Sequence, residues 1–238
     1  MRRSDLPAKT DHQTLKILAC TLTKRRPNMS LHLIIGDKLY SSWSLRAALA
    51  LDLTGASYTE ELIKLNQPDT RARVLKHSPT GKVPLLKSEH GTIADSLAIA
   101  EYLAEQFPDA GLWPKDTAAR AQARSACAQM HSGFFAMRGN MPFDLSHNAP
   151  LLPTPPDVQA EIERMLALWA ECRAAATEAG PFLFGGATLA DAFFAPIAVR
   201  LRTYQAKLPE VDAAYVETIY QWPAFKAWQK AGLEEVGQ

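Results

Sequence analysis

The sequence predicts an α/β domain followed by an all-helical domain, and three observations lead to this prediction. Short apolar runs of β type alternate with helical patterns in the first part of the chain. Residues 107–114 then hold two prolines and a glycine, which cannot continue a helix. Beyond this segment the chain is helical in character. We therefore expect an extension over residues 1–28 and domains over residues 29–112 and 113–238.

The first half of the α/β domain is predicted to alternate strand and helix. The run LHLII at residues 31–35 predicts a strand, which Gly36 and Asp37 end. Residues 44–53 are helix-forming, and residues 58–65 predict a second strand. A second helix is expected to begin at the sequence PDT that starts at Pro68, because Asp and Thr cap free amide groups well.

The second half of this domain is predicted to be a hairpin and a helix. Residues 83–87 and 92–93 flank the sequence EHG, a plausible hairpin turn. Asp95 and Ser96 are good capping residues, and the residues after them have helical apolar spacing. The complete order is βαβαββα, which is a thioredoxin-like pattern.

The second domain is predicted to contain long helices. Residues 117–141 are Ala-rich and predict one helix, whereas residues 148–156 carry four prolines and predict a loop. Residues 158–179 predict another long helix. The sequence TLAD at residues 188–191 is a capping-box variant with Asp in place of Glu, and residues 192–199 after it are almost wholly apolar. This last helix is expected to be central and buried.

Composition excludes several classes of function. The formal net charge of +1 and pI near 7.7 create no global field for nucleic acid or an anionic membrane, so neither is an expected partner. The three cysteines, Cys20, Cys127 and Cys172, follow neither a disulfide nor a zinc pattern, which favours a cytoplasmic protein without a metal. No apolar stretch approaches the roughly 18 residues of a membrane span.

Three segments together resemble the soluble glutathione transferase family over residues 31–232. The sequence YSSWSLR at residues 40–46 is similar to the active-site turn of its serine-type classes, especially zeta. The sequence GKVP at residues 81–84, with DSLAI at residues 95–99, is similar to its cis-proline turn and carboxylate-binding helix start. The sequence TLAD is similar to the cap of its buried sixth helix. The resemblance implies a cytosolic glutathione S-transferase, serine-type and zeta-like.

The predicted catalytic group is a serine hydroxyl at a helix start. A free thiol has a pKa near 8.5, and a hydroxyl that donates a hydrogen bond to the sulfur favours the thiolate, as does the helix dipole. The spacing of the family pattern from Arg46 favours Ser41 over Ser42, and Tyr40 is the residue type that other classes use. Helix capping is the alternative role of these serines. Trp43 departs from the cysteine often found there in zeta members.

The resemblance also implies a set of residues that bind glutathione. A cis bond between Val83 and Pro84 would leave the Val83 amide and carbonyl free to pair with the tripeptide as a strand edge does. Asp95 and Ser96 at a helix N-terminus suit the γ-glutamyl unit, and Lys82 suits the glycine carboxylate. An ordinary trans turn, helix capping and a solvated lysine are the alternatives for these positions.

The second substrate is expected to lie against the first helix of the helical domain. Met130, His131, Phe134 and Arg138 are the candidates, because the family builds its variable pocket there. His131 and Arg138 are seven residues apart and should fall on nearly one helix face. Core packing is the alternative for these side chains, especially the apolar ones.

Three functions remain open at this point. The first is detoxification by conjugation of the glutathione thiolate to a small electrophile, with glutathione as cosubstrate and no metal. The second is glutathione-dependent cis-trans isomerisation of a maleylacetoacetate-type diacid, and the third is a non-catalytic binding protein with the same fold. The resemblance also implies a homodimer.

We predict that residues 1–28 are disordered and dispensable. This extension carries seven Lys or Arg against two Asp, a net charge of +5, and has little apolar surface to offset its ordering entropy. Deleting it should leave the melting temperature unchanged in a thermal unfolding experiment. A fall of several degrees would show that the extension packs on the body of the protein.

Overall fold

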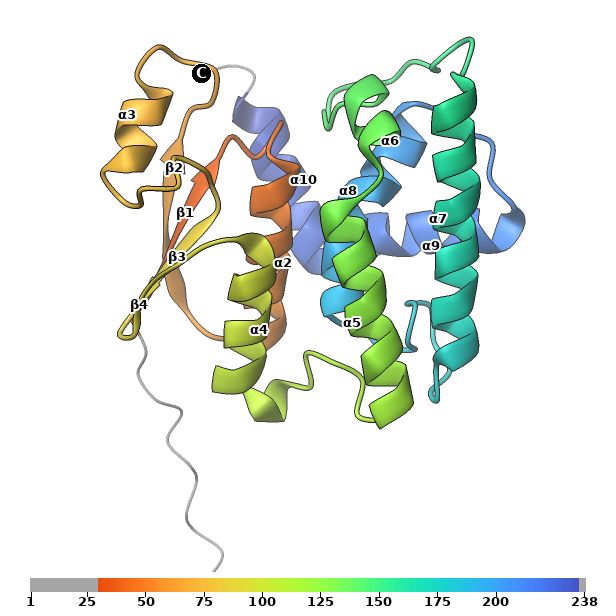
Figure 1. Cartoon of the computed structure of the whole chain (residues 1–238), viewed down its shortest axis with the longest axis horizontal. Coiled ribbons are helices and arrows are strands. Elements are labelled where there is room, and N and C mark those ends of the chain that lie inside the picture. Colours follow the sequence, from red (N-terminus) through yellow and green to blue (C-terminus); the bar gives the residue numbers. More distant parts are fainter. Residues whose placement is uncertain (1–29, 236–238) are drawn as a thin grey trace, which may run out of the picture.

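The computed structural model describes residues 30–235, and the predicted fold class is confirmed there. A four-stranded sheet with helices α2 to α4 lies beside a group of helices, α5 to α9 (Figure 1). We call residues 30–112 the sheet region and residues 113–235 the helical region. The extension over residues 1–28 lies outside the described residues, and so does Cys20.

The sheet has the strand order β2-β1-β3-β4. β1 (Leu31–Gly36) pairs in parallel with β2 (Tyr58–Ile63) and antiparallel with β3 (Leu85–Ser88), which forms a hairpin with β4 (Gly91–Ile93). β1 is nearly all apolar and buried because helices cover both faces of the sheet. Ile34 packs with Val74 on the α3 side, whereas Leu33 and Ile35 belong to the main core.

The helices of the sheet region begin and end close to the predicted positions. α2 (Ser42–Thr54) and α4 (Ser96–Gln106) lie on the face of the sheet that looks toward the helical region, and α3 (Thr70–Leu75) lies on the other face (Figure 1). A short 3-10 helix, η1 (Pro108–Ala110), follows α4 within the predicted proline-rich break. The caps of α2 and α4 are Ser41 and Asp95, as their sequence suggested.

The helical region packs around α8 (Leu189–Thr203), almost all of whose residues are buried. Around it lie α5 (Thr117–Ser132), α7 (Pro156–Ala175) and α9 (Glu210–Gln221). The proline-rich loop before α7 is observed as predicted. Among residues 30–235, no helix has both the length and the apolar character that crossing a membrane requires.

The buried N-terminus of α8 is closed by the predicted capping box. The Thr188 amide donates to Asp191 Oδ2 at 2.8 Å, and the Ala190 amide donates to Thr188 Oγ1 at 3.2 Å. Burial raises the pKa of the Asp191 carboxyl to about 6, against hydrogen bonds from Leu183 and Tyr215 that lower it. Because the pKa of this carboxyl in the folded protein exceeds its ordinary value of 3.8, its contribution to stability is lost as the pH rises from about 4 to about 6.

One predicted helix is wrong: residues 117–141 do not form a continuous helix. α5 stops at Ser132, and α6 (Phe135–Asn140) starts after two non-helical residues. Gly133 is extended and Phe134 has a φ of 62°, so the backbone turns and the Phe134 side chain enters the core with 1% exposure. Burial of this aromatic side chain offsets the cost of its left-handed backbone. His131 and Arg138 therefore lie on different helices.

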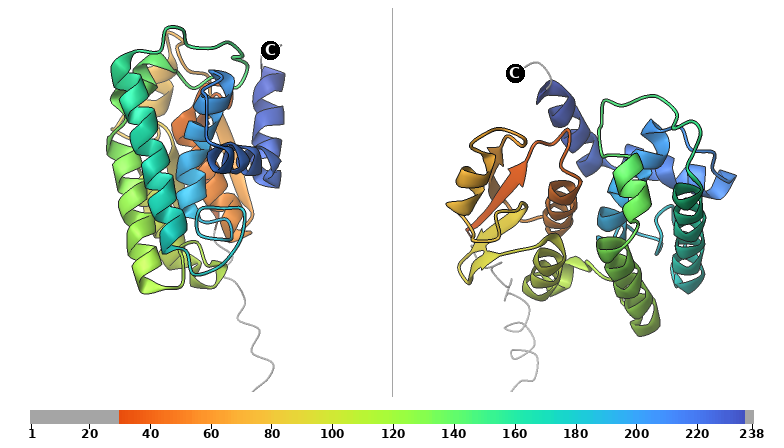
Figure 2. Two further views of the ribbon diagram at one scale, coloured as in Figure 1. Left: turned by 90° about the vertical axis from the view of Figure 1, so that its right-hand side faces the viewer. Right: turned by 45° about the horizontal axis from the view of Figure 1, so that its top comes forward.

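The last helix, α10 (Pro223–Glu234), returns to the sheet region and packs beside α2 (Figure 2). Trp228 Nε1 donates to the Lys38 carbonyl at 3.0 Å, and the Lys38 amide donates to Glu235 Oε2 at 2.9 Å. A Cβ at Gly232 would lie 3.1 Å from the Leu39 nitrogen, so glycine at this position favours the close approach of α10 to the loop. These contacts hold the β1–α2 loop against the end of the chain.

We predict that Thr188→Ala destabilises the protein through loss of the α8 cap. Loss of an N-cap costs about 0.5–2 kcal/mol, which is about 1–8 °C in melting temperature for a chain of this size. Thermal unfolding followed by circular dichroism measures the change. Thr218→Ala on α9, where the hydroxyl only bonds back to the Ala214 carbonyl, is the matched control and should stay within about 0.5 kcal/mol of the parent. Equal melting temperatures of the two variants would contradict the assignment.

Candidate functional site

A cleft of about 660 Å³ opens on the sheet region beside the helical region. It brings together four of the residues selected from sequence, Lys82, Val83, Pro84 and Asp95. The other residues that line it are Trp43, Leu65, Thr70, Val74, Thr80, Gly81 and Ala94. The mixture of apolar walls with a few polar groups is typical of a small-molecule site. The contributions of α3 and Thr80 to the cleft were not predicted from the sequence, although Thr80 and Gly81 directly precede Lys82.

The floor of the cleft is the turn before β3. The Val83–Pro84 peptide bond is cis. Val83 takes part in no hydrogen bond among the described residues, so its amide and carbonyl are available to a ligand. Gly81 has a φ of 62°, a left-handed backbone that glycine adopts without the strain of a side chain.

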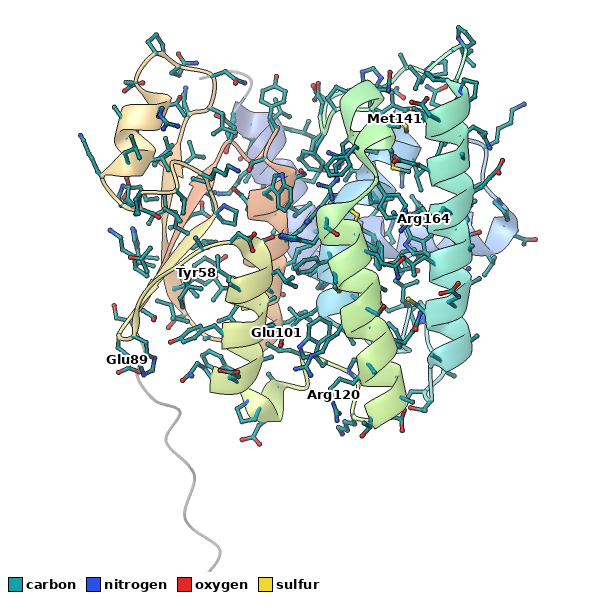
Figure 3. All side chains as sticks on the ribbon, in the orientation of Figure 1. Tyr58, Glu89, Glu101, Arg120, Met141 and Arg164 are labelled. Carbon is teal, nitrogen blue, oxygen red and sulfur yellow. The ribbon has the colours of Figure 1, made fainter. Side chains whose placement is uncertain are left out.

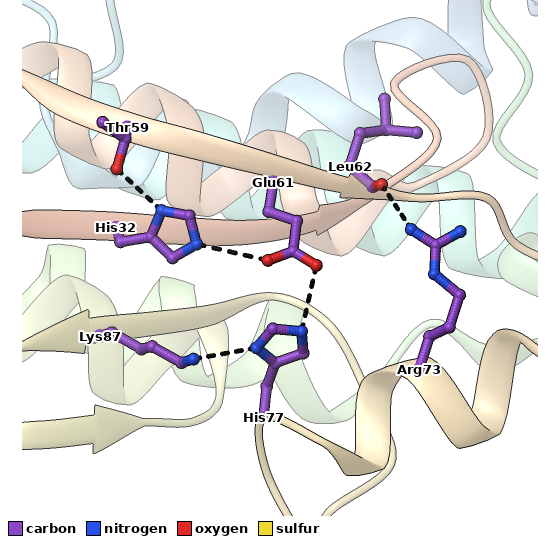
Figure 4. Close-up of polar contacts among 7 residues, drawn as sticks. All are labelled: His32, Thr59, Glu61, Leu62, Arg73, His77 and Lys87. Carbon is purple, nitrogen blue, oxygen red and sulfur yellow. Dashed lines mark hydrogen bonds and ion pairs between the residues drawn. The ribbon is translucent and has the colours of Figure 1, made fainter.

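The wall formed by α3 is fixed to the outer face of the sheet (Figure 4). His77 follows α3, and its Nε2 lies 3.1 Å from Glu61 Oε1 on β2, while Lys87 Nζ on β3 lies 3.0 Å from His77 Nδ1. Arg73 Nη2 donates to the Leu62 carbonyl at 3.3 Å. These polar contacts with β2 and β3 hold α3 in place, and two residues of α3 line the cleft.

The N-terminus of α4 forms another side of the site. Asp95 Oδ1 accepts from the Leu97 amide at 2.9 Å, while its side chain remains 55% exposed and lines the cleft. Ser96 is fully buried, and its hydroxyl has no hydrogen-bond partner. Thus both predicted residues lie at the helix start, but only Asp95 of the two lines the cleft. The positive end of the helix dipole favours an anionic group here.

The two candidate serines differ in their hydrogen bonds. Ser41 Oγ accepts from the Ser44 amide at 3.3 Å and donates to Ser44 Oγ at 2.7 Å, so Ser41 does cap α2. Ser44 Oγ in turn accepts from the Gly36 amide at 3.0 Å. The Ser42 hydroxyl forms no hydrogen bond with any described residue. Both side chains are nearly buried, at 5% and 7% exposure, and neither lines the cleft in this structure.

Trp43, which sequence analysis left without a role, connects the two regions. Its ring lies 4.4 Å from the Arg46 guanidinium carbon and 5.1 Å from that of Arg138. His131 meets the same ring edge-on, with centroids 5.1 Å apart. The guanidinium groups are stabilised by the negative face of the indole ring. A sequence signal for this contact is absent, because the partners come from α2, α5 and α6.

His131 and Arg138 contact residues that line the cleft but do not line it themselves, whereas Met130 and Phe134 are core residues. His131 Nε2 lies 3.1 Å from Asp95 Oδ2. Arg138 Nη2 donates to the carbonyls of Met130 and His131, and so places a cation at the free C-terminal end of α5. Met130 and Phe134 are buried in the core, at 0% and 1% exposure.

The junction between the regions carries excess positive charge. Arg46 is 1% exposed, and its Nε and Nη1 have no hydrogen-bond partner. Burial lowers the pKa of Arg46, and the nearby Arg138 and Arg200 lower it further. Among residues 30–235, neither Arg46 nor Arg138 forms an ion pair with a carboxylate. Charges arranged in this way favour an anionic ligand nearby.

Other chemistries find little support in the described part of the chain. Across residues 30–235, His, Cys, Asp and Glu side chains form no group of three or more that could hold a metal. Cys127 and Cys172 are buried, and burial raises the pKa of the Cys172 thiol to about 12, so it is a poor nucleophile.

Glu101 Oε2 on α4 faces α5 (Figure 3), where it binds Arg124 at 3.1 Å and Trp113 Nε1 at 3.3 Å; this contact joins the two regions away from the cleft.

Comparisons with known proteins agree with this geometry. Residues 40–106 match the family model of the glutathione S-transferase N-terminal domain. "Probable maleylacetoacetate isomerase" of Caenorhabditis elegans is 36% identical over 99 residues, 40% of this chain and 46% of that protein. "Probable glutathione transferase" of Aplysia californica is 35% identical over 83 residues, 34% of this chain and 87% of that protein. The matched segment spans less than half the length of the first of these relatives.

A solved structure extends the likeness to both regions. The crystal structure of maleylacetoacetate isomerase from Anaeromyxobacter dehalogenans, with glutathione bound in its active site, has a TM-score of 0.61 and 27% sequence identity. The alignment covers 84% of this chain and 94% of that chain. The similarity therefore includes the helical region as well as the sheet region.

Proposed function

This chain belongs to the glutathione S-transferase family, and from that premise we propose that it binds glutathione and conjugates its thiolate to small electrophilic substrates. The observation that carries the proposal is the cleft in which Lys82, Val83, Pro84 and Asp95 meet. A free backbone edge at Val83, the negative charge of Asp95 and the positive charge of Lys82 lie in one cleft, which suits a tripeptide with charged ends. Glutathione is the cosubstrate in this proposal, without a metal, and the cytoplasm is the compartment.

Each part of glutathione has a complementary group at the site. The free amide and carbonyl of Val83 pair with the cysteinyl residue as a neighbouring strand does. The Asp95 carboxylate attracts the γ-glutamyl ammonium, and the start of α4 at Ser96 attracts the γ-glutamyl carboxylate. Lys82, on the same turn as Val83, takes the glycine carboxylate. We propose that this glutathione-binding domain ends at about residue 112.

The thiol is activated by a hydroxyl at the start of α2. Ser41 is the primary assignment and Ser42 the alternative. The Ser41 oxygen can keep its hydrogen bond from the Ser44 amide while the Ser41 hydroxyl proton turns from Ser44 Oγ to the sulfur. Ser44 Oγ would then still accept a hydrogen bond from the Gly36 amide. The thiol proton leaves to solvent, and the thiolate attacks the electrophile. Ser42 is the alternative because its hydroxyl already lacks a partner.

The second substrate meets the helical side of the site. We assign His131 and Arg138 to its polar wall and Met130 and Phe134 to the packing behind that wall, since both apolar side chains are buried. Trp43 adds an aromatic surface between the regions. This combination suits an acceptor with both an apolar body and a negative group.

Isomerisation of a maleylacetoacetate-type diacid is the second candidate function. The unpaired charges of Arg46 and Arg138 favour it, because carboxylates of a diacid would neutralise them. The thiolate would add to a double-bond carbon, rotation would follow about the resulting single bond, and loss of the thiolate would restore the double bond. Formation of a stable conjugate distinguishes transfer from isomerisation. A non-catalytic binding protein would bind glutathione without lowering the pKa of its thiol.

We predict that Ser41→Ala separates thiol activation from binding. Loss of a hydrogen bond to an anion costs about 1.5–3 kcal/mol, so turnover at neutral pH should fall about tenfold to a hundredfold, whereas glutathione affinity should change much less. Titration of the bound thiolate by its ultraviolet absorbance measures the pKa in the parent, Ser41→Ala and Ser42→Ala. Asp95→Ala should do the opposite and weaken binding first.

The same titration contains the outcomes that would contradict this mechanism. An unshifted pKa of the bound glutathione thiol in the parent protein would show that neither serine activates the thiol. A loss confined to Ser42→Ala would transfer the role to Ser42. Melting temperatures of both variants serve as controls, because loss of the Ser41 cap should also lower stability by about 0.5–2 kcal/mol.

We also propose that two chains form a homodimer, with the N-terminal domain of one subunit against the helical domain of the other. Isologous pairing is the common symmetry of homodimers. Light scattering at micromolar concentration should give the mass of two chains. The mass of a single chain would contradict the homodimer without affecting the assignment of the cleft.

A further inference from the structure

Asp95 and His131 form a polar contact that joins the two regions directly at the cleft. Asp95 Oδ1 caps α4 through the Leu97 and Ala98 amides, at 2.9 and 3.5 Å. The other oxygen, Oδ2, lies 3.1 Å from His131 Nε2 in the last turn of α5. One carboxylate oxygen is thus held by its own helix and the other by the helical region.

The surroundings of His131 indicate its protonation state. Burial lowers the pKa of the imidazole, Asp95 opposes this effect, and Arg46 and Arg138 add to it. Its Nδ1 is buried without a hydrogen-bond partner. A second proton, on Nδ1 as well as Nε2, would make the ring an imidazolium and place a third positive charge beside the two guanidinium groups. The neutral ring therefore carries its proton on Nε2 and donates it to Asp95 Oδ2.

A neutral donor has a particular consequence for Asp95. A lysine or arginine at this place would neutralise the carboxylate and compete with a cationic ligand group. A neutral imidazole fixes the orientation of the carboxylate and leaves its negative charge in place. The Asp95 side chain is 55% exposed and lines the cleft, so this charge is accessible to a ligand in the cleft.

The imidazole ring is itself held on two sides. Trp43 meets it edge-on at a centroid distance of 5.1 Å, and Phe193 of α8 lies tilted to it at 6.5 Å. The side chain of His131 is only 20% exposed. Rotation away from Asp95 would break these aromatic contacts, so the donor is preorganised before any ligand arrives.

We propose that His131 is a positioning residue of the glutathione site, which holds the Asp95 carboxylate toward the ammonium of the γ-glutamyl unit. This inference rests on the proposed function. It changes the role given to His131 from a contact with the second substrate to a support for the first. The helical region of the same chain thereby completes a site that the sheet region otherwise builds.

Two matched substitutions test the proposal by isothermal titration of glutathione into the full-length protein. His131→Phe keeps a ring against Trp43 but removes the donor, and it should weaken glutathione binding about threefold to tenfold. His131→Gln keeps an amide donor near the position of Nε2 and should restore most of the affinity. His147→Phe, at a histidine that stacks on Tyr204 with centroids 4.0 Å apart, is the control and should bind like the parent.

A ligand without the ammonium separates positioning from a general structural effect. Glutaryl-cysteinyl-glycine is glutathione that lacks its amine, so it gains nothing from the orientation of Asp95. The parent and His131→Phe should bind this analogue equally. In an Asp95→Asn background, His131→Phe should cause no further loss of glutathione affinity, because the charge that it orients is already gone.

The outcomes separate this inference from the function on which it rests. If the parent protein does not bind glutathione, the proposed function fails and the inference with it. If the parent binds but His131→Phe binds equally well, the inference alone is wrong. Equal weakening of glutathione and the amine-free analogue would also overturn it, since His131 would then act through packing. Should His131→Phe fail to fold, His131→Gln still tests the role of the donor, because we expect this variant to bind glutathione nearly as well as the parent. A loss of glutathione affinity in His131→Gln would contradict the inference.

Discussion

The structure depends on capping the N-terminus of α8, a helix that is buried along nearly its whole length. Its first amides therefore need partners inside the protein. The Asp191 carboxylate and the Thr188 hydroxyl supply them, and Asp191 also accepts from the Leu183 amide and the Tyr215 hydroxyl. Burial of a carboxylate is unfavourable and raises its pKa, and four hydrogen bonds, from the Thr188 amide and hydroxyl, the Leu183 amide and the Tyr215 hydroxyl, offset this cost. With its end closed, α8 can serve as the surface on which α2, α5 and α9 pack.

This packing has an electrostatic consequence at the site. α2 lies directly against α8, so Arg46 is enclosed between Trp43 of its own helix and Phe193 of α8. Arg200 of α8 is also buried, and its guanidinium donates to the Met141 and Pro196 carbonyls. Burial lowers the pKa of Arg200 to about 9, with a further contribution from Arg138. Positive charge near the α2 start would stabilise an anionic thiolate or carboxylate.

The loop between β1 and α2 is supported from a distant part of the chain. Residues 37–41 connect β1 to α2 and include Ser41, the cap of α2. α10 fixes this loop through Trp228, Glu235 and the close contact at Gly232. The two regions thus share one continuous core and meet at the loop, at Trp43 and at Asp95. Loss of this support would therefore affect the site even though α10 does not line the cleft.

The amino-acid sequence by itself determined the order of strands and helices in the sheet region, the caps at Ser41, Asp95 and Thr188, and the turn that places Lys82 and Val83 together. These features follow from local signals, namely apolar periodicity, glycine, proline and short polar side chains, which act within a few residues. Only the tertiary structure decided the break between α5 and α6, the return of α10, and the partners of Ser41, Trp43 and His131. The Gly133 break follows from burial of Phe134 in the core, and Trp43 meets residues about 90 positions away. Such contacts depend on which helix surfaces pack together, and local propensity carries no information about that choice.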